Sequence, residues 1–305
     1  MRFFVTGASG FIGSAVVQEL INAGHRVLGL ARSDSAATSL AAAGAEVHRG
    51  TLDDIDSLKR GAAECDGVIH TAFIHNFATM AASADTDRLA IEALGDALAG
   101  SGRPLVVTSV IGLLAPGRVG TEEDTPDPKS PGAHRTASEQ TALALATRDV
   151  RVSVVRLPPS VHGDGDRAFI PALIRIAREK KVSAYIGDGD NRWSTVHRLD
   201  AARLFRLALE KGRAGARYHG IGEEGVATRA IAEVIGRRLQ IPVVSKSRER
   251  ASEHFGWLAR FAGNDISATS KQTQSELGWH PEQPGLIADL DNGRYFEAPA
   301  THSTG

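Results

Sequence analysis

Cysteine is almost absent from this 305-residue chain, which has only Cys65. A single cysteine excludes an intrachain disulfide or a multi-cysteine metal site and indicates a reducing compartment, so we expect a cytoplasmic protein. The histidines show no HxH, HxxxH or HExxH spacing, and we therefore expect no metal site. These absences exclude extracellular disulfide scaffolds and common metalloenzymes.

Excess charge and long apolar runs are also missing. The formal net charge is -1 at pH 7, so we expect neither a nucleic acid nor an anionic membrane surface as partner. The first residues lack a signal-peptide pattern, and no run of about 18 apolar residues follows. We expect a soluble protein with a sizeable core.

What the sequence does contain is a regular alternation of short β-branched runs and longer amphipathic stretches over its first 160 residues. This pattern predicts an α/β fold with a Rossmann doubly wound parallel sheet covered by helices on both faces. A helix follows the first strand, and Gly24 stands where a left-handed residue would end it. The predicted strands are Arg2–Thr6, Arg26–Ala31, Glu46–Arg49, Gly67–Thr71, Leu105–Ser109 and Arg151–Leu157.

A second, smaller α/β lobe is predicted after Leu157, where proline, glycine and charged residues become frequent. The chain is expected to return to the first domain near Ser194, because Val196 and the periodic leucines that follow resemble core positions. The sequence thus predicts a dinucleotide-binding domain of residues 1–160 and about 194–222, and a substrate-binding lobe of about 161–193 and 223–305.

The stretch Thr6–Gly13, TGASGFIG, lies between the first predicted strand and the first predicted helix. Gly7 permits the tight turn, Gly10 lets the backbone approach a pyrophosphate, and Gly13 allows close packing of helix on strand. The alternative is a glycine-rich turn without a ligand. The position between strand and helix favours dinucleotide binding.

The end of the second strand indicates which dinucleotide binds. An acidic residue here would hold the ribose 2′-hydroxyl of NAD, but the sequence has Arg32 and Ser33. A guanidinium suits a 2′-phosphate, so NADP(H) is preferred. The alternative is that Arg32 is a solvated charge stacking on adenine, and Asp34, two positions later, keeps NAD(H) possible.

Several motifs of the chain resemble the extended and atypical short-chain dehydrogenases/reductases, in particular the NAD-dependent epimerase/dehydratase-like proteins. They are TGASGFIG, DGVIHTA, LVVTS, VVRLPPSVHG, NRWSTVHRLDAARL and LGWHP. The resemblance implies a pyrophosphate site on the glycine turn, an adenine site after the third strand and a nicotinamide site at the ends of later strands. The residues it assigns to the cofactor are Gly7, Gly10, Phe11, Ile12, Gly13, Thr51, Leu52, Thr71, Ala72, Phe73, Thr108, Ser109, Arg135, Pro158 and Pro159.

The Tyr-x-x-x-Lys pair on which that family's proton transfer normally depends is missing. None of Tyr185, Tyr218 and Tyr295 has a lysine four residues later. Alignment on Glu139 places Arg135 at the lysine position, where it could hold the ribose but would make a poor acid. The chain therefore resembles an atypical subgroup in which basic residues replace the pair.

Another proton donor is needed, and the candidates are histidines. His134 is nearest in sequence, and its alternative is a surface histidine at a helix start. His75 follows the fourth strand, where it could touch substrate or be a plain loop residue. Ser109, His134, Arg135 and His75 form the candidate catalytic set.

Other residues have weaker claims. His162 and Arg192 could contact substrate, although Arg192 could equally pair with Asp188, Asp190 or Asp200, and His70 fits a hydrogen-bonded core position. The acidic run at 122–124 resembles a solvated loop. Side chains that could wall an apolar substrate pocket, or simply pack, are Phe73, Phe77, Met80, Phe169 and Trp193.

Three functions compete. The favoured one is an NADP(H)-dependent oxidoreductase that reduces a small organic carbonyl or imine substrate by hydride transfer. The second is a nucleotide-sugar epimerase/dehydratase-like enzyme, which would need the missing pair more strictly. The third is a non-catalytic NADP(H)-binding redox sensor. In each case we expect a small-molecule ligand and, from the resemblance, a possible homodimer.

Overall fold

A large parallel sheet forms the centre of the computed structural model, which describes residues 1–75 and 79–297. Its strands run in the order β11-β7-β5-β4-β1-β2-β3, and every neighbouring pair is parallel. The predicted α/β fold class is confirmed. The strands are β1 (Arg2–Thr6), β2 (Arg26–Ala31), β3 (Glu46–Arg49), β4 (Gly67–His70), β5 (Pro104–Val110), β7 (Arg151–Leu157) and β11 (Ala216–His219).

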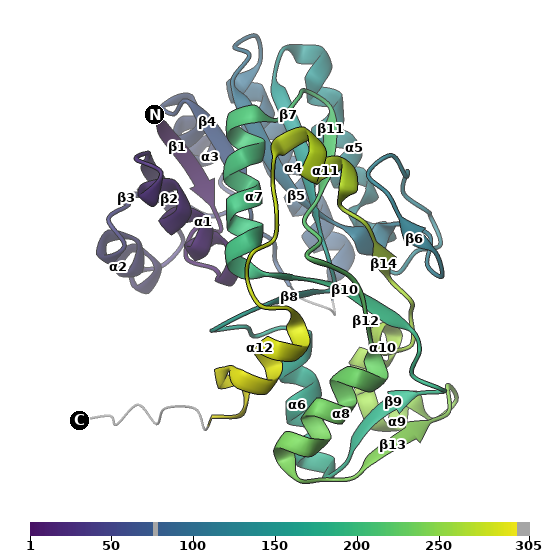
Figure 1. Ribbon diagram of the computed structural model, residues 1–305. Coiled ribbons are helices and arrows are strands. Elements are labelled where there is room, and N and C mark those ends of the chain that lie inside the picture. Colours follow the sequence, from purple (N-terminus) through teal and green to yellow (C-terminus); the bar gives the residue numbers. More distant parts are fainter. Residues whose placement is uncertain (76–78, 298–305) are drawn as a thin grey trace, which may run out of the picture.

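Helices cover both faces of this sheet, which is why its strands are apolar on both sides. Phe3 and Val5 of β1 belong to the core beneath α1 and α7, whereas Phe4 belongs to the core on the other face. Figure 1 shows α7 and α1 side by side across one face. The helices of this part are α1 (Phe11–Asn22), α2 (Asp34–Ala42), α3 (Ile55–Ala63), α4 (Met80–Leu98), α5 (Thr136–Ala144) and α7 (Arg198–Lys211).

Strands β1 and β4 lie next to each other at the point where the strand order reverses. In open parallel sheets a ligand binds outside the carboxyl ends of the strands at this reversal. Here those ends are Thr6 and His70, which pair with each other. The fold therefore brings the glycine turn and the end of β4 together.

Most predicted strand bounds in this sheet are confirmed, and Gly24 has the left-handed backbone (φ +82°) expected at the end of α1. Strand β11 was not predicted, because its short sequence ARYH has little β-branched character. Strand β10 (Arg192–His197) lies in a separate sheet and not in the large one, although its Val196 does join the core beneath α7.

The lobe lies below the large sheet in Figure 1. Its core is formed mainly by α6, α8 and α12 around Trp193. The proposed domain boundaries stay a prediction. The lobe and its connections contain β6 (Val119–Gly120), β8 (Ser160–His162), β9 (Ser183–Ile186), β10, β12 (Glu223–Ala227), β13 (Val243–Lys246), β14 (Ser267–Ala268), α6 (Phe169–Lys180), α8 (Thr228–Leu239), α9 (Ala251–Phe255), α10 (Ala259–Ala262), α11 (Lys271–Leu277) and α12 (Leu286–Asn292).

Short 3₁₀ helices complete the described chain. They are η1 (Ile111–Leu113), η2 (Ala133–Arg135), η3 (Leu145–Arg148), η4 (Gly256–Leu258) and η5 (Arg294–Phe296). Helix η2 carries His134 and Arg135, two of the candidate catalytic residues, directly before α5.

Candidate cofactor and active site

The glycine turn is packed so closely that side chains are excluded at two of its positions. Gly7 has φ +66°, and a Cβ atom there would lie 2.7 Å from the backbone nitrogen of Ala72. A Cβ atom on Gly13 would lie 2.0 Å from the carbonyl oxygen of Gly7. Glycine is therefore required for the turn and for the approach of α1 to β4.

Helix α1 begins without a side-chain cap. Its N-cap residue is Gly10, which has an extended backbone. Glycine has no side chain, so nothing at this position accepts a hydrogen bond from the first-turn amides. The first N–H groups of a helix have no partner within the helix, so the amides from Phe11 to Gly13 are available to an anion. The turn thus fits the pyrophosphate of a dinucleotide.

At the end of β2, Arg32 is exposed, and no carboxylate of the described residues pairs with it. Ser33 caps α2, because its hydroxyl accepts the Ala36 amide at 3.2 Å. Asp34 pairs with Arg49 at 2.8 Å. Asp34 thus has a basic partner, whereas the Arg32 guanidinium has no carboxylate partner in the part of the chain that the structure describes.

The end of β4 is tied to the glycine turn. Thr71 donates its hydroxyl to the Thr6 carbonyl at 2.8 Å, and the Ala72 amide donates to the Thr6 hydroxyl at 3.4 Å. After β3, Thr51 is exposed and hydrogen-bonds to Asp53, while Leu52 packs on the core. The resemblance assigns Thr71, Ala72, Thr51 and Leu52 to the cofactor, and that assignment stays a prediction.

Arg135 lies almost fully buried beside the ends of β4 and β5. It donates Nη2 to the Thr108 carbonyl at 2.8 Å, and its Cζ lies 4.1 Å from the centre of the Phe73 ring. Its charge is balanced by Asp87 of α4, with Nη2 and Oδ2 3.4 Å apart. The arginine at the expected lysine position is thus held at the ends of two central strands.

Asp87 connects Arg135 to the glycine turn. Its Oδ1 lies 3.1 Å from His70 Nε2, and His70 Nδ1 lies 2.7 Å from the Thr6 hydroxyl. Burial opposes ionisation of Asp87, but Arg135 and His70 lower its pKa overall. His70 is buried and hydrogen-bonded as predicted, whereas sequence reasoning missed Asp87, for which no signal exists beyond its place on a helix.

His75 and His134 both lie close enough to Arg135 to feel its charge. Partial desolvation lowers the pKa of each imidazole, although His75 is exposed and His134 half-buried, and the positive charge of Arg135 lowers it further. The His75 ring also packs edge-on against Phe73, 5.1 Å away. Both histidines are therefore favoured in the neutral form, and the structure brings three of the four candidate catalytic residues together.

Ser109, the fourth candidate, is in a different environment. Its side chain is buried and lies beside the Glu139 carboxylate, whose pKa it helps to lower. Because side chains alternate along a strand, Thr108 of β5 points the other way, and its hydroxyl donates to the His70 carbonyl at 2.8 Å. We therefore leave Ser109 out of the catalytic proposal and keep Thr108 at the cofactor side.

Two expected substrate contacts have other partners. His162 is buried and bonds to Asp289 at 2.8 Å. Arg192 pairs with Asp265 at 3.4 Å, not with Asp188, Asp190 or Asp200. Asp200 instead accepts the backbone amides of Glu282 and Gln283.

The acidic run at 122–124 is not a solvated loop, which corrects the sequence-based expectation. Glu122 is 3% exposed and accepts hydrogen bonds from the amide and hydroxyl of Thr273, at 2.9 and 2.7 Å. Asp124 pairs with Arg118 at 2.7 Å. The run fastens the region before α5 to α11.

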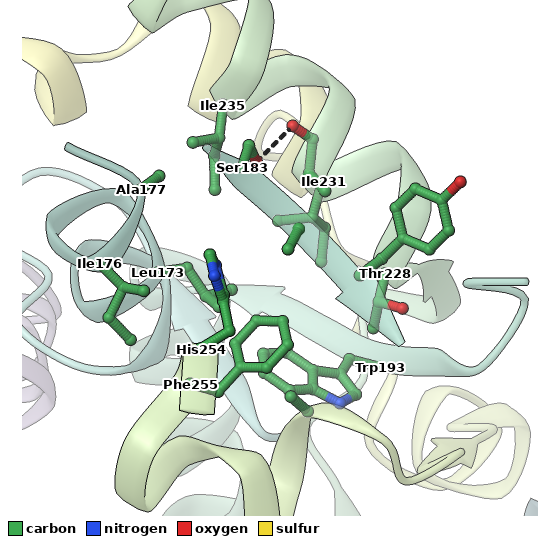
Figure 2. Close-up of a pocket in the computed structure, with 14 residues that line it drawn as sticks. Leu173, Ile176, Ala177, Ser183, Trp193, Thr228, Ile231, Ile235, His254 and Phe255 are labelled. Carbon is green, nitrogen blue, oxygen red and sulfur yellow. Dashed lines mark hydrogen bonds between the residues drawn. The ribbon is translucent and has the colours of Figure 1, made fainter. Parts of the chain in front are cut away.

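The expected aromatic wall is divided between two places. Phe73 lies under Arg135, but Phe169 and Trp193 pack on each other in the lobe, with ring centres 5.6 Å apart. Figure 2 shows the cavity beside Trp193, lined by α6, β9, α8 and α9. Its volume of about 20 Å³ leaves room for one water at most. Phe77 falls outside the described residues.

Together, the parallel sheet, the strand-order reversal and the uncapped glycine turn define a Rossmann-type dinucleotide-binding fold. The model of the NAD dependent epimerase/dehydratase family matches residues 3–221, and the chain belongs to this family. This confirms the resemblance inferred from the motifs.

Relatives extend over nearly the whole chain. An uncharacterised protein of Schizosaccharomyces pombe is 51% identical over 97% of this chain and 100% of its own length. A 4-hydroxy-2-methyl-3-oxo-4-farnesyl-3,4-dihydroquinoline-1-oxide ketoreductase of Stigmatella aurantiaca is 31% identical over 92% of each chain. The family thus includes reductases as well as epimerases and dehydratases.

A solved structure shares the fold. The dTDP-glucose 4,6-dehydratase DesIV of Streptomyces venezuelae, solved with NAD bound, superposes with a TM-score of 0.78 at 23% identity, covering 97% of each chain. At this identity the likeness extends to the fold alone.

Proposed function

We propose that the chain is an NADP(H)-dependent oxidoreductase that reduces a small organic carbonyl or imine. The observation that carries this proposal is the uncapped glycine turn at the strand-order reversal, together with an exposed Arg32 that pairs with no described carboxylate. Bound NADPH would supply the hydride. NAD(H) is the alternative cofactor, because Arg32 can also stack on adenine without a 2′-phosphate.

The chain's own residues would bind and orient the cofactor. The amides of Phe11, Ile12 and Gly13 would hold the pyrophosphate, and Arg32 the 2′-phosphate. Arg135, fixed against the Thr108 carbonyl, would hold the nicotinamide ribose. The remaining proposed contacts are Gly7, Gly10, Ser33, Thr51, Leu52, Thr71, Ala72, Phe73, Thr108, Pro158 and Pro159.

Proton supply distinguishes the possible substrates. Arg135 stays protonated, so it orients rather than donates. The lowered pKa favours the neutral form of His134 and His75. A neutral ring can donate an N–H hydrogen bond to a carbonyl oxygen, but few of these rings carry the extra proton that a general acid donates at pH 7. A pre-formed iminium needs hydride without an acid, and this chemistry suits such a site. The ketoreductase relative supports reduction as the reaction class.

The test combines turnover with cofactor binding. Purified protein is mixed with NADPH and a panel of aldehydes, ketones and cyclic imines, and loss of the reduced cofactor is followed by absorbance. Arg32→Gln should weaken NADPH binding about tenfold in calorimetry and leave NADH binding unchanged. Binding without any turnover would favour the sensor, and sugar interconversion with retained cofactor the epimerase. Failure of both NADPH and NADH to bind at millimolar concentration would refute the proposal.

Location and assembly stay predictions. In the described part of the chain no helix has both the length and the apolar character needed to cross a membrane. The single cysteine supports a cytoplasmic setting. The homodimer rests on the resemblance alone and is checked by light scattering.

A further inference from the structure

Arg198, the first residue of α7, lies against the first residue of α1. Its Cζ is 5.0 Å from the centre of the Phe11 ring. Phe11 opens the uncapped first turn that faces the expected pyrophosphate. A positive side chain therefore lies beside the anion-binding end of α1, although it comes from a distant part of the sequence.

The charge of Arg198 has no carboxylate partner within residues 1–75 and 79–297. Its Nη1 donates to the backbone carbonyl of Asp164 at 2.7 Å. Two other arginines of α7 are paired, Arg203 with Glu282 at 2.7 Å and Arg206 with Glu19 at 2.7 Å. Arg198 thus differs from the other two arginines of α7, because no carboxylate of the described residues neutralises its positive charge.

The acidic groups nearby are directed elsewhere. Asp166, on the loop that Arg198 holds, accepts the Tyr295 hydroxyl at 3.1 Å and the Ala168 amide at 2.7 Å. Burial raises the pKa of Asp166 to about 6, so it is only partly ionised near that pH. Asp200 accepts two backbone amides from the segment before α12. None of these carboxylates neutralises Arg198.

The loop after β8 fixes the guanidinium in place. Gly163 has φ +130°, and a Cβ atom there would lie 3.0 Å from Arg198 Cγ. Gly165 has φ +87°, and a Cβ atom there would lie 3.6 Å from Arg198 Nη1 and 3.9 Å from the Phe11 ring. Glycines at these two points let the loop lie across both Arg198 and Phe11.

We propose that Arg198 binds the pyrophosphate of the dinucleotide, adding a guanidinium to the backbone amides of α1. This inference rests on the proposed function and assigns a further residue to that site. A guanidinium fork matches phosphate oxygens, and helix amides alone provide only partial charge. Two other basic residues of the same segment have partners of their own. Arg192 pairs with Asp265, and His197 caps α7 by accepting the Leu199 amide. Arg198 is therefore the residue that we assign to this role.

Calorimetry with four ligands tests the assignment. Arg198→Gln should weaken NADPH, NADH and ADP-ribose about tenfold each, because all three carry the pyrophosphate. It should leave adenosine 2′-monophosphate unchanged, because that ligand lacks the pyrophosphate. Arg32→Gln should give the complementary result, weakening NADPH and adenosine 2′-monophosphate only. Arg203→Gln, on the same helix, is the matched control and should change none of the four.

The outcomes separate this inference from the proposed function. If the wild-type chain binds NADPH and Arg198→Gln binds it equally well, the inference fails and the proposed function stands. If Arg198→Gln loses adenosine 2′-monophosphate as strongly as NADPH, or melts well below Arg203→Gln, its role is structural and the inference again fails. Arg198→Lys, which keeps the charge without the fork, should lie between wild type and Arg198→Gln.

Discussion

Two buried arginines close to helix α5 have very different surroundings. Arg156 meets Glu139 through two hydrogen bonds, Nε to Oε2 at 3.0 Å and Nη2 to Oε1 at 2.5 Å, and it also donates to the Asp124 carbonyl. Arg135 meets Asp87 through one 3.4 Å contact, and its Nε has no partner among the described residues. The Arg156 guanidinium thus has partners within the protein, whereas Arg135 keeps an N–H group that could donate to a ligand.

We infer different roles for the two pairs from this difference. A buried charge costs free energy unless it is paired and its hydrogen bonds are satisfied. Burial opposes ionisation of Glu139, yet Arg156 holds the pKa of that carboxyl below its ordinary value. The Arg156 pair therefore suits a role in the fold, while the incomplete Arg135 pair, at the ends of β4 and β5, suits contact with a ligand.

The largest expected effect comes from Glu139→Gln. The change leaves the fully buried Arg156 without a counter-charge, and we expect the free energy of unfolding to fall by about 3–5 kcal/mol in urea titrations. In the wild type the pair's contribution should be present above the ordinary glutamate pKa and be lost as pH falls through the lowered one.

The control for this prediction is Glu276→Gln, which breaks the more exposed Arg213 pair at 2.7 Å. It should cost at most about 1 kcal/mol. Equal losses in the two variants would contradict the structural role given to the Arg156 pair.

A smaller loss of stability, about 1–3 kcal/mol, is expected for Asp87→Asn. The Thr108 carbonyl and the Phe73 ring still contact Arg135, and this substitution keeps the shape of the side chain while removing its charge. NADPH affinity, measured by calorimetry on the folded protein, should fall as well because Arg135 is no longer held. Asp96→Asn is the matched control, since Asp96 lies on the same helix in an exposed pair with Lys59.

If Asp87→Asn keeps its cofactor affinity and loses as much stability as Glu139→Gln, the two pairs do not differ in role. Arg135 would then be another structural arginine. The opposite result, weaker binding with little loss of stability, would sharpen the comparison.

Sequence separation explains which features of the fold and the site could be predicted. The glycine turn and the strands depend on neighbouring residues, so their spacing identifies them. Asp87 and His70 are 17 residues apart in the sequence and come into contact only in the folded chain. Glu122 accepts a hydrogen bond from Thr273, which is 151 residues away in the sequence. A local pattern therefore cannot distinguish Glu122 from a solvated acid, nor Ser109 beside Glu139 from a serine beside the cofactor.

The smallest expected effect concerns the two histidines on the Arg135 side. Their lowered pKa means that few are protonated at pH 7, so His134→Ala should lower kcat about tenfold there, and His75→Ala less. If His134 acts as the acid, the wild-type reduction rate should rise as pH falls below 6.5, because the protonated fraction grows. That rise should vanish in His134→Ala and persist in the exposed control His280→Ala. Rates unchanged in both site variants would remove the histidines from catalysis and leave hydride transfer to a substrate that needs no acid.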